Sequence, residues 1–322
     1  MTRLEEAFAD EMEQVNALII ERMQSPVGMI PDLAAHLVSA GGKRLRPLIT
    51  LASADLAGYQ GDAHFKLAAT VEFIHSATLL HDDIVDGSPM RRGKPAANTV
   101  WGNAASVLVG DFLFARAFSL MVETGRLRVL DILAGASSII AEGEVRQLAA
   151  IANMDMSEPE YMQIIEAKTA ELFASAARVS AVIADLPERQ EVALDRYGRE
   201  LGLAFQLVDD ALDYAGNAKK LGKAVGDDFR EGKITMPVAK AMLTANATEQ
   251  EFWTDVFSKT ERTKSDLDKA MKLISSHNAV QLTLDQADLH IQNAKAALQY
   301  FEPGKTRTLL CDVCDFVLER SF

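Results

Sequence analysis

Apolar residues recur three and four positions apart along almost the whole chain, which is the periodicity of helices with one buried face. No stretch shows convincing strand-like alternation. The pattern predicts helices over residues 2–23, 28–40, 44–57, 62–85, 103–123, 127–154, 157–184, 188–215, 235–246, 249–258, 263–276, 282–300 and 304–320. We therefore expect an all-α fold.

Recognisable signals separate the predicted helices. Gly41-Gly42 follows one helix, Ser157 and Glu160 form a capping box at the start of another, and Pro187 precedes a third. No Gly/Ser-rich linker or low-complexity tract divides the 322 residues. We expect a single domain over residues 1–322.

Composition and charge narrow the class of protein. The net charge of −13 disfavours nucleic-acid binding. The longest stretch without charged side chains, residues 95–110, is too short to span a bilayer, and residues 1–6 lack the order of a signal peptide. These features indicate a cytosolic protein.

Cys311 and Cys314 form a C-x-x-C pair, which we interpret as reduced structural thiols because no second ligand pair accompanies it.

Two aspartate-rich segments share the spacing D-D-x-x-D, and each follows an apolar run. Their members are Asp82, Asp83 and Asp86 in the first segment, and Asp209, Asp210 and Asp213 in the second. In a helix the first and last Asp of each motif lie on one face, while the middle Asp lies ~100° away. Three carboxylates at the end of a buried helix repel one another unless cations neutralise them.

Oxygen ligands without a Cys or His set suit a hard divalent ion such as Mg²⁺. This ion usually joins one or two carboxylates to the phosphates of a substrate. The motifs therefore predict a phosphorylated substrate held between two facing acidic helix ends. The alternative is that the acidic clusters only mark helix ends or solvated faces, which is harder to maintain for two motifs than for one.

Basic segments accompany both motifs. The two longest irregular segments, 87–102 and 216–233, follow them directly and carry Arg91-Arg92 and several lysines. We expect loops that close over a site there. A third basic segment, 41–47, opens a helix and offers backbone N–H groups and cationic side chains to an anion. Alone it would also suit a solvated turn, but beside the other two it favours phosphate binding.

Together these motifs resemble those of the trans-isoprenyl (polyprenyl) diphosphate synthases, over nearly the whole chain. The matching segments are Gly42-Lys43-Arg44-Leu45-Arg46-Pro47, the first aspartate-rich motif with Arg91-Arg92, Lys168-Thr169, Phe205-Gln206 with the second motif, and Gly226-Asp227-Asp228 with Gly232-Lys233. The resemblance implies antiparallel helices around a central cavity, with the two acidic motifs facing each other at its mouth, and a homodimer.

The resemblance also implies a role for individual residues. Three Mg²⁺ ions would be held by Asp82, Asp86 and Asp209, with Asp83, Asp210 and Asp213 as nearby acceptors. The allylic diphosphate would be bound by Arg91, Lys168 and Lys223, with Lys233 also in the substrate site. Isopentenyl diphosphate would be bound by Lys43, Arg46, His75 and Arg92. The oxygens of Thr169 and Gln206 would point at the developing carbocation.

Charge balance agrees with these roles. Six ionised Asp give about −6 and an allylic diphosphate about −3, against about +9 from three Mg²⁺ and three basic side chains.

The expected reaction follows from this charge balance. The cations would stabilise the departing pyrophosphate, so that the allylic C–O bond ionises. The isopentenyl double bond would then attack the carbocation, and a proton would be lost. No strong base is among the matched residues, so we expect pyrophosphate to accept the proton. His75 is the alternative base, but we favour it as a phosphate donor.

Product length is expected to depend on the helix before the first motif. In the family an aromatic residue there shortens the product, and here Ala77 and Thr78 are small. Phe73 and Ile74 lie one turn deeper on the same helix. On the next predicted helix, Phe112 and Phe114 could supply a floor for the product or be ordinary core. Residues 73–81 most resemble long-chain bacterial enzymes that make octaprenyl to decaprenyl diphosphate for quinone side chains, a product that passes to a membrane enzyme.

Three alternatives remain at this stage. A shorter-chain farnesyl or geranylgeranyl synthase would share every motif. A terpene cyclase would share the ionisation chemistry, but its second motif usually differs and it has no use for the cluster around Lys43. A non-catalytic subunit of a heteromeric synthase would tend to have lost motif residues, which this chain retains.

Overall fold

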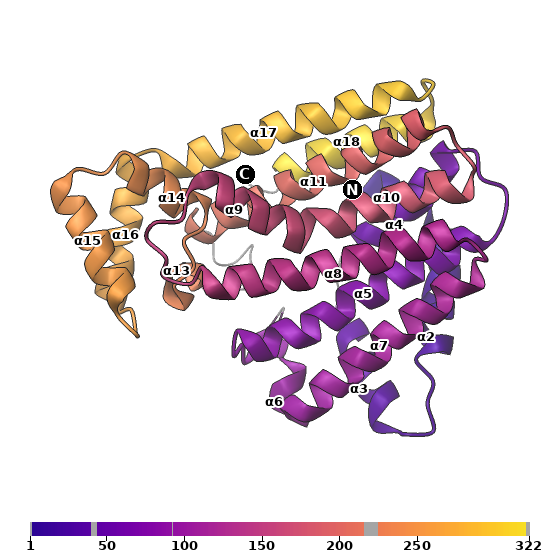
Figure 1. Cartoon of the computed structure of the whole chain (residues 1–322), viewed down its shortest axis with the longest axis horizontal. Helices are drawn as coiled ribbons and strands as arrows, with labels where there is room; N and C mark the ends of the chain where they lie inside the picture. The colour runs from indigo at the N-terminus through magenta and orange to yellow at the C-terminus, as the bar shows by residue number, and fades with distance from the viewer. Residues whose placement is uncertain (1, 40–43, 92, 216–224, 320–322) are drawn as a thin grey trace. The chain divides into compact units, whose positions relative to one another are not determined.

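The computed structural model describes residues 2–39, 44–91, 93–215 and 225–319. Most of these residues are helical, which confirms the predicted all-α class (Figure 1). The first helices are α1 (Thr2–Ala7), α2 (Ala9–Arg22), α3 (Met29–Ser39), α4 (Leu45–Leu56), α5 (Ala63–Val85), α6 (Ala97–Trp101), α7 (Asn103–Glu123) and α8 (Leu127–Ala149). Those that follow are α9 (Glu158–Ile165), the π-helix η1 (Glu166–Ala170), α10 (Glu171–Ile183), α11 (Glu188–Tyr214), α13 (Asp227–Glu231), α14 (Met236–Leu243), α15 (Ala247–Ser258), α16 (Lys264–Ser276), α17 (Ala279–Ala297), the 3₁₀ helix η2 (Leu298–Tyr300) and α18 (Lys305–Glu319).

Two long predicted helices are interrupted. The predicted helix 157–184 divides into α9, the π-helix η1 and α10, and the predicted helix 2–23 breaks at Phe8 between α1 and α2. A π-helix keeps the apolar face of its neighbours almost in register, so apolar periodicity alone does not reveal it.

The segment predicted to be irregular after the first motif contains short regular elements. Strands β1 (Met90–Arg91) and β2 (Lys94–Pro95) form an antiparallel hairpin, in which Met90 pairs with Pro95 and Arg91 with Lys94. Helix α6 follows directly. Two-residue strands are too short to show an alternation of apolar and polar residues, so they could not be predicted from this pattern.

Side-chain caps determine where several helices begin. The predicted capping box at α9 is confirmed, since Ser157 Oγ accepts from the backbone N–H of Glu160 and the Glu160 carboxylate accepts from the backbone N–H of Ser157. Equivalent boxes begin α15, with Asn246 and Glu249, and α16, with Thr263 and Asp266. Each box satisfies two amide groups that a helix start leaves unpaired.

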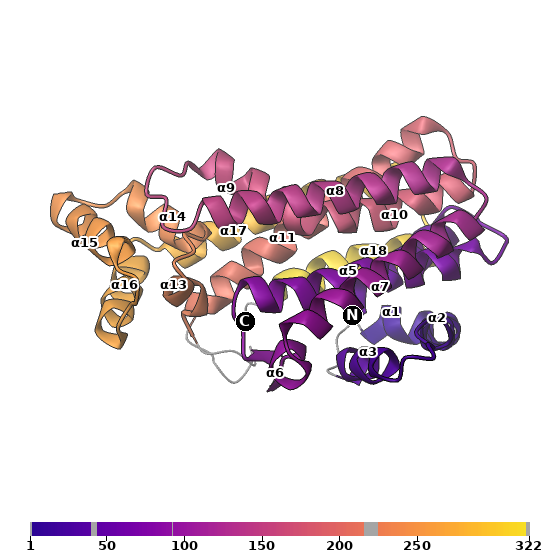
Figure 2. The ribbon, with the colours of Figure 1, turned by 60° about the horizontal axis from the view of Figure 1, so that its bottom comes forward.

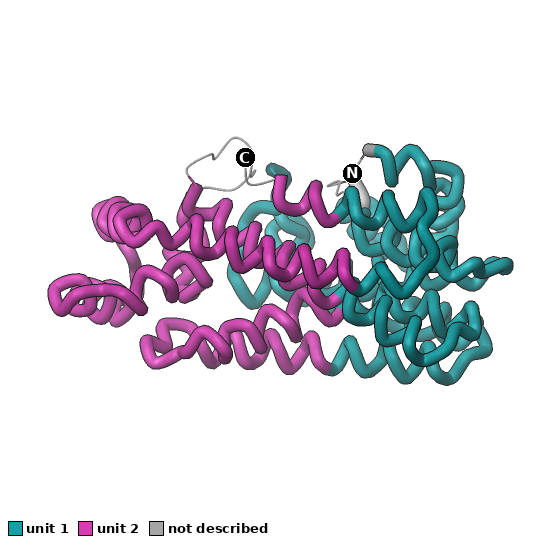
Figure 3. Tube along the Cα trace, turned by 90° about the horizontal axis from the view of Figure 1, so that it is seen from above, with its two compact units in different colours: residues 1–138, 172–198, 297–313 teal, residues 139–171, 199–296, 314–322 magenta. Residues whose placement is uncertain are grey.

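The chain forms two compact units (Figure 3). Unit 1 comprises residues 1–138, 172–198 and 297–313. Within it α5 packs along α7, and α2 and α4 also contact α5 (Figures 1 and 2). The apolar side chains that face inward include Phe73 on α5 and Leu113 on α7, both about 1% exposed. This packing fixes the end of α5, where the first aspartate-rich motif lies.

Unit 2 comprises residues 139–171, 199–296 and 314–322. Helix α14 contacts α9, α15 and α16, around a core that contains Phe229, Trp253 and Phe257. The rings of Trp253 and Phe257 stack with centroids 6.1 Å apart. Phe229 comes from the five-residue helix α13, and burying a side chain of this kind contributes roughly 2 kcal/mol. The core therefore anchors the segment that follows the second aspartate-rich motif.

Helix α7 is long and apolar enough to cross a membrane by length and composition alone. Its buried residues recur at the helical period from Ser106 to Met121, and α7 packs along α5 through them. This is the pattern of a core helix. The opposite face carries exposed apolar side chains, among them Leu108, Phe118 and Val122.

Candidate active site

The first aspartate-rich motif lies at the end of α5. Its middle residue, Asp83, is 1% exposed, whereas Asp82 and Asp86 are half-buried. Arg91 from β1 donates three hydrogen bonds to the Asp83 carboxylate, from Nε at 2.9 and 2.8 Å and from Nη2 at 2.7 Å. A bidentate guanidinium compensates the cost of burying that carboxylate. Arg91, predicted to bind diphosphate, is thus held beside the motif.

Three further contacts fix the segment after this motif. Asn98 Nδ2 donates to the backbone carbonyl of Asp83 at 3.0 Å, and the backbone N–H of Ser88 donates to the same oxygen at 2.9 Å. His36 Nε2 on α3 lies 2.8 Å from the carbonyl oxygen of Pro95 in β2. Side-chain contacts therefore hold both β1 and β2 of the hairpin in place.

The second motif lies near the end of α11, with Asp210 1% and Asp213 7% exposed and Asp209 half-buried. The hydroxyl of Tyr161 donates to one carboxylate oxygen of Asp210, and Gln206 Nε2 donates to the other at 2.9 Å. Asp213 accepts the backbone N–H groups at the start of α13, from residues 227 and 228 at 3.3 and 3.2 Å. Both oxygens of Asp210 and both oxygens of Asp213 therefore accept hydrogen bonds.

Burial and crowding of carboxylates raise the pKa values of this motif. Burial is the larger cause and the charge of Asp228 the next, and together they raise the pKa of Asp210 to about 8 and that of Asp213 to about 7. Hydrogen bonds from Tyr161 and Gln206 act in the opposite direction at Asp210. Asp228 belongs to a segment that matched the family, but sequence reasoning gave it no part in this cluster.

The residues of the two motifs fit a hard divalent cation. Their ligand atoms are all carboxylate oxygens, which suit such an ion. Burial, and after it the charge of Asp228, raises the pKa values of Asp210 and Asp213, and a bound cation would offset both effects. Within the described parts of the chain, no three His, Cys, Asp or Glu side chains already converge closely enough to hold a metal ion.

Lys168 and Thr169 lie in the π-helix η1, a distortion that is often found at functional sites. Lys168 Nζ donates to Glu144 of α8 at 2.8 Å, and Thr169 Oγ1 donates to Gln206 Oε1 at 2.9 Å. Next to Glu144, Gly143 lets α8 approach closely, because a Cβ at that position would lie 2.9 Å from the backbone nitrogen of Lys168. The structure therefore brings Thr169 and Gln206 into direct contact.

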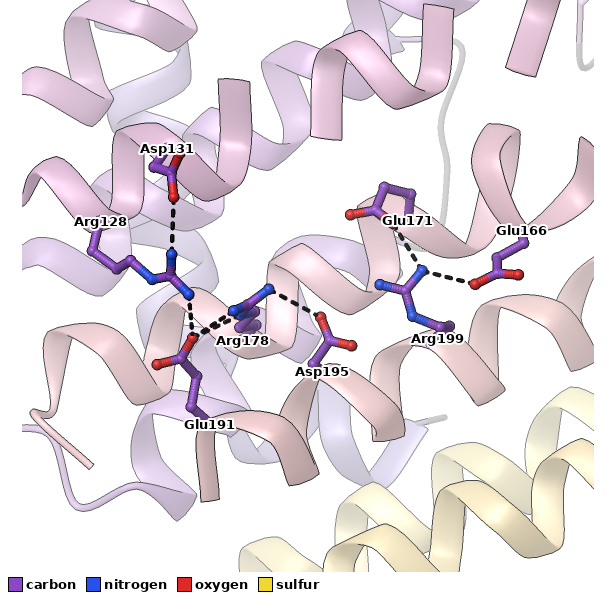
Figure 4. Close-up of polar contacts among 8 residues, drawn as sticks. All are labelled: Arg128, Asp131, Glu166, Glu171, Arg178, Glu191, Asp195 and Arg199. Carbon is purple, nitrogen blue, oxygen red and sulfur yellow. Dashed lines mark hydrogen bonds and ion pairs between the residues drawn. The ribbon is translucent and has the colours of Figure 1, made fainter. Parts of the chain in front are cut away.

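Arg199 of α11 holds both ends of η1 (Figure 4). Its Nη1 lies 3.2 Å from Glu166, the first residue of η1, and 2.8 Å from Glu171, which follows the last. Sequence reasoning missed Arg199, Glu144 and Tyr161. Their partners are 24 to 49 residues away along the chain, so no local motif could identify them.

Two residues predicted to bind isopentenyl diphosphate lie together in unit 1. Arg46 Nη1 is 3.3 Å from His75 Nε2, and its guanidinium lies over the ring of Phe173, 4.2 Å from the centroid. Lys233, in unit 2, pairs with Glu231 at 2.7 Å. Three further predicted ligands lie outside the described residues: Lys43, Arg92 and Lys223.

The residues predicted to control product length are mostly buried. Phe73, Ile74 and Ala77 are at most 1% exposed, and the half-buried Thr78 donates its hydroxyl to the backbone carbonyl of His75 at 2.8 Å. On α7 the half-buried rings of the two predicted floor residues have polar neighbours. Phe112 lies under Arg116, 4.7 Å from the guanidinium, and Phe114 lies 6.0 Å from the His81 ring.

Comparison with known proteins extends these observations. A model of the polyprenyl synthetase family matches residues 28–274. The octaprenyl diphosphate synthase of Escherichia coli (strain K12) is 42% identical over 320 residues, which cover 99% of this chain and 99% of that protein.

Two solved structures of related synthases are similar to this chain over nearly its whole length. A decaprenyl diphosphate synthase from Rhodobacter capsulatus has a TM-score of 0.96 at 51% identity, over 100% of this chain and 99% of that one. A polyprenyl synthase from Caulobacter crescentus CB15, complexed with calcium and isoprenyl diphosphate, has a TM-score of 0.96 at 53% identity, over 100% and 98% of the two chains.

Proposed function

The chain belongs to the polyprenyl synthetase family and is a prenyltransferase, and we propose that it joins isopentenyl diphosphate units head to tail onto an allylic diphosphate primer. The product is an all-trans polyprenyl diphosphate of octaprenyl to decaprenyl length, suited to quinone side chains. The observation that carries this proposal is the likeness, over almost the whole chain, to synthases of octaprenyl and decaprenyl diphosphate. The small side chains of Ala77 and Thr78 agree with a long product.

Asp82, Asp86 and Asp209 would hold Mg²⁺ against the allylic diphosphate, with three ions per site and with Asp213 nearby. These three carboxylates keep partial exposure, which supports a role as ligands. The calcium and isoprenyl diphosphate named for the Caulobacter crescentus enzyme support a divalent metal next to the diphosphate. The bound metal supplies positive charge that stabilises the departing pyrophosphate.

The protein's own cations and polar groups complete the site. Arg91, Lys168, Lys223 and Lys233 hold the allylic diphosphate, while the Arg46 and His75 pair, with Lys43 and Arg92, orients isopentenyl diphosphate. The allylic C–O bond breaks and its electron pair leaves with pyrophosphate. The isopentenyl double bond then forms the new C–C bond, and the adjacent proton passes to a pyrophosphate oxygen. Thr169 and Gln206 direct oxygens at the carbon that bears the positive charge.

The first test is incorporation of labelled isopentenyl diphosphate with farnesyl diphosphate as primer, with Mg²⁺ or with EDTA. We expect label in extractable products only with Mg²⁺. Asp82→Asn should lower turnover by about 100-fold or more, whereas Asp131→Asn, an exposed Asp paired with Arg128, should not change it. Incorporation that continues in EDTA would contradict the metal role, and a wild-type protein that incorporates nothing would favour a non-catalytic subunit.

The protein is further proposed to be a homodimer. Leu108 and Val122 on α7 are 66% and 64% exposed, and apolar side chains of this size usually gain by association. Sedimentation equilibrium should give twice the mass of the chain, and a monomer at micromolar concentration would contradict the proposal.

The cytoplasm is the proposed location, with loose association at the membrane when the product passes to a membrane enzyme. A polyprenyl tail is apolar and needs either the protein interior or a bilayer. Fractionation should therefore find the protein on membranes mainly when product has accumulated, and equal recovery with and without product would contradict this.

A further inference from the structure

Tyr161 lies at the end of a chain of four hydrogen-bonded side chains in unit 2. Its hydroxyl, on α9, donates to Asp210, and both side chains are buried, at 5% and 1% exposure. The other oxygen of Asp210 accepts from Gln206 Nε2 at 2.9 Å, and Gln206 Oε1 accepts from Thr169 Oγ1 at 2.9 Å. The chain thus runs from Tyr161 to one of the residues proposed to face the reacting carbon.

The carboxyl group of Asp210 sets the direction of every hydrogen bond in this chain. A carboxylate only accepts, so Gln206 must present its NH₂ group to Asp210 and its carbonyl oxygen to Thr169. The hydroxyl of Thr169 must then donate its proton to Gln206, which leaves the lone pairs of Thr169 for an electron-poor neighbour. This orientation of Thr169 is the one that could stabilise a developing carbocation.

Tyr161 holds Asp210 in the orientation that this requires. Its hydroxyl donates to one carboxylate oxygen, and the other oxygen faces the amide of Gln206. Without the hydroxyl, the buried carboxylate loses the hydrogen bond that fixes its first oxygen. The amide of Gln206 and the hydroxyl of Thr169 then lose their fixed orientation.

We propose that Tyr161 is a positioning residue of the reaction, which acts through Asp210 and Gln206 to turn the oxygen lone pairs of Thr169 toward the allylic carbon. The proposal rests on the proposed function, in which Thr169 and Gln206 face that carbon. It also gives the buried Asp210 a task other than metal binding, since both of its oxygens are already engaged.

A second buried tyrosine in the same protein provides the matched control. Tyr197 is fully buried, and its hydroxyl donates to the backbone carbonyl of Leu310 at 3.1 Å. That hydrogen bond ends at a backbone carbonyl in unit 1. Tyr161→Phe and Tyr197→Phe therefore each remove one buried hydroxyl, but only the first is expected to affect the reaction.

The experiment measures kcat and KM for both substrates in Tyr161→Phe, Tyr197→Phe, Thr169→Val and the double variant Tyr161→Phe with Thr169→Val. Assays are run at a temperature at which circular dichroism shows all variants folded. We expect Tyr161→Phe to lower kcat by about 10- to 100-fold, the usual effect of removing an outer partner of a site residue, with both KM values within about threefold of wild type. In the Thr169→Val background, Tyr161→Phe should lower kcat by less than about twofold, because the row of hydrogen-bonded side chains has already lost its last member.

Two results would overturn the positioning role while leaving the proposed function intact. One is a wild-type kcat in Tyr161→Phe. The other is an equal fold loss from Tyr161→Phe in both backgrounds, which would mean that Tyr161 does not act through Thr169. A kcat loss of the same size in Tyr197→Phe would also count against it, as a general effect of a lost buried hydroxyl. A wild-type protein without turnover would instead refute the proposed function.

Discussion

The middle residue of each aspartate-rich motif is an internal anchor. Asp83 and Asp210 are each 1% exposed and hydrogen-bonded inside their own units, while Asp82, Asp86 and Asp209 keep partial exposure. The helical geometry accounts for this, because the middle Asp is turned ~100° from the first. We infer that the D-D-x-x-D spacing joins one buried, anchoring carboxylate to a first Asp that is partly exposed. The last Asp differs between the motifs, because Asp86 is partly exposed whereas Asp213 is buried and hydrogen-bonded.

A single residue on α5 should limit the product. Ala77 is fully buried, and Ala77→Tyr would place a bulky ring where we expect the growing chain to pass. The change should shorten the final products by several isoprene units. Because overpacking costs about 1–3 kcal/mol, thermal unfolding must show that the variant is folded before its products are analysed by chromatography.

The adjacent Ser76, half-buried on another face of α5, is the control. Ser76→Tyr should leave product length unchanged. If Ala77→Tyr also gives products of full length, the chain grows along a path that does not pass this position.

At the scale of elements, η1 is the distortion that carries Lys168 and Thr169, two of the proposed site residues. It is held by Arg199 at both ends and approached by α8 at Gly143. A π-helix has poorer intrinsic stability than an α-helix, so external contacts must maintain it. Arg199 is therefore expected to matter for catalysis although it is not among the proposed ligands.

Replacing Arg199 should separate catalysis from stability. Arg199→Met removes both ion pairs with the ends of η1, and we expect kcat to fall by about tenfold because Lys168 and Thr169 lose their fixed positions. Steady-state kinetics on the purified variant measure this directly.

Arg178 gives the matched comparison, since it is similarly exposed, 28% against 26%, and pairs with Glu191 and Asp195 (Figure 4). Arg178→Met should change stability by less than about 1 kcal/mol and leave kcat as in wild type. An equal loss of kcat in both variants would show that the function of η1 does not depend on the ion pairs of Arg199 with Glu166 and Glu171.

The capping box of α16 should give a pH-dependent contribution to stability. Hydrogen bonds from the backbone N–H and the hydroxyl of Thr263 lower the pKa of Asp266 from 3.8 to about 2, with a further contribution from Lys259. A lowered pKa in the folded state stabilises the protein above pH ~3.8, and that contribution disappears as the pH falls toward 2.

Asp266→Ala should therefore lower the free energy of unfolding by less than about 1 kcal/mol at pH 7, and the difference from wild type should shrink between pH ~4 and ~3. Urea unfolding at several pH values measures it. Asp268→Ala, which replaces an exposed Asp on the same helix outside the capping box, is the control variant. If the difference in the free energy of unfolding stays constant down to pH 3, the negative charge of Asp266 does not contribute to the stability of the capping box.

Particular residues show how far sequence patterns could predict this structure. The helix start at Ser157 was predictable from a local capping rule. The family motifs identified Thr169 and Gln206 as candidate site residues, but not the hydrogen bond between them. The burial of Asp83 also follows from helical spacing, although its partner does not. The contact between Tyr161 and Asp210 spans 49 residues and depends on how two helices pack, which neither periodicity nor motif spacing contains.

At the scale of the whole molecule, the chain contains two compact units, and the family match over residues 28–274 includes parts of both. Helices α8, α11 and α18 each have residues in both units. We therefore propose that residues 1–322 act as one synthase domain. The proposed roles agree, since Asp82 and Asp86 belong to unit 1 and Asp209 to unit 2.

The length of the product tests this account most directly. Purified protein would be incubated with Mg²⁺, farnesyl diphosphate and excess labelled isopentenyl diphosphate, and the dephosphorylated products separated against polyprenol standards. We expect a ladder that ends at octaprenol to decaprenol. A ladder that ends at fifteen or twenty carbons would contradict the long-chain assignment and the open path at Ala77.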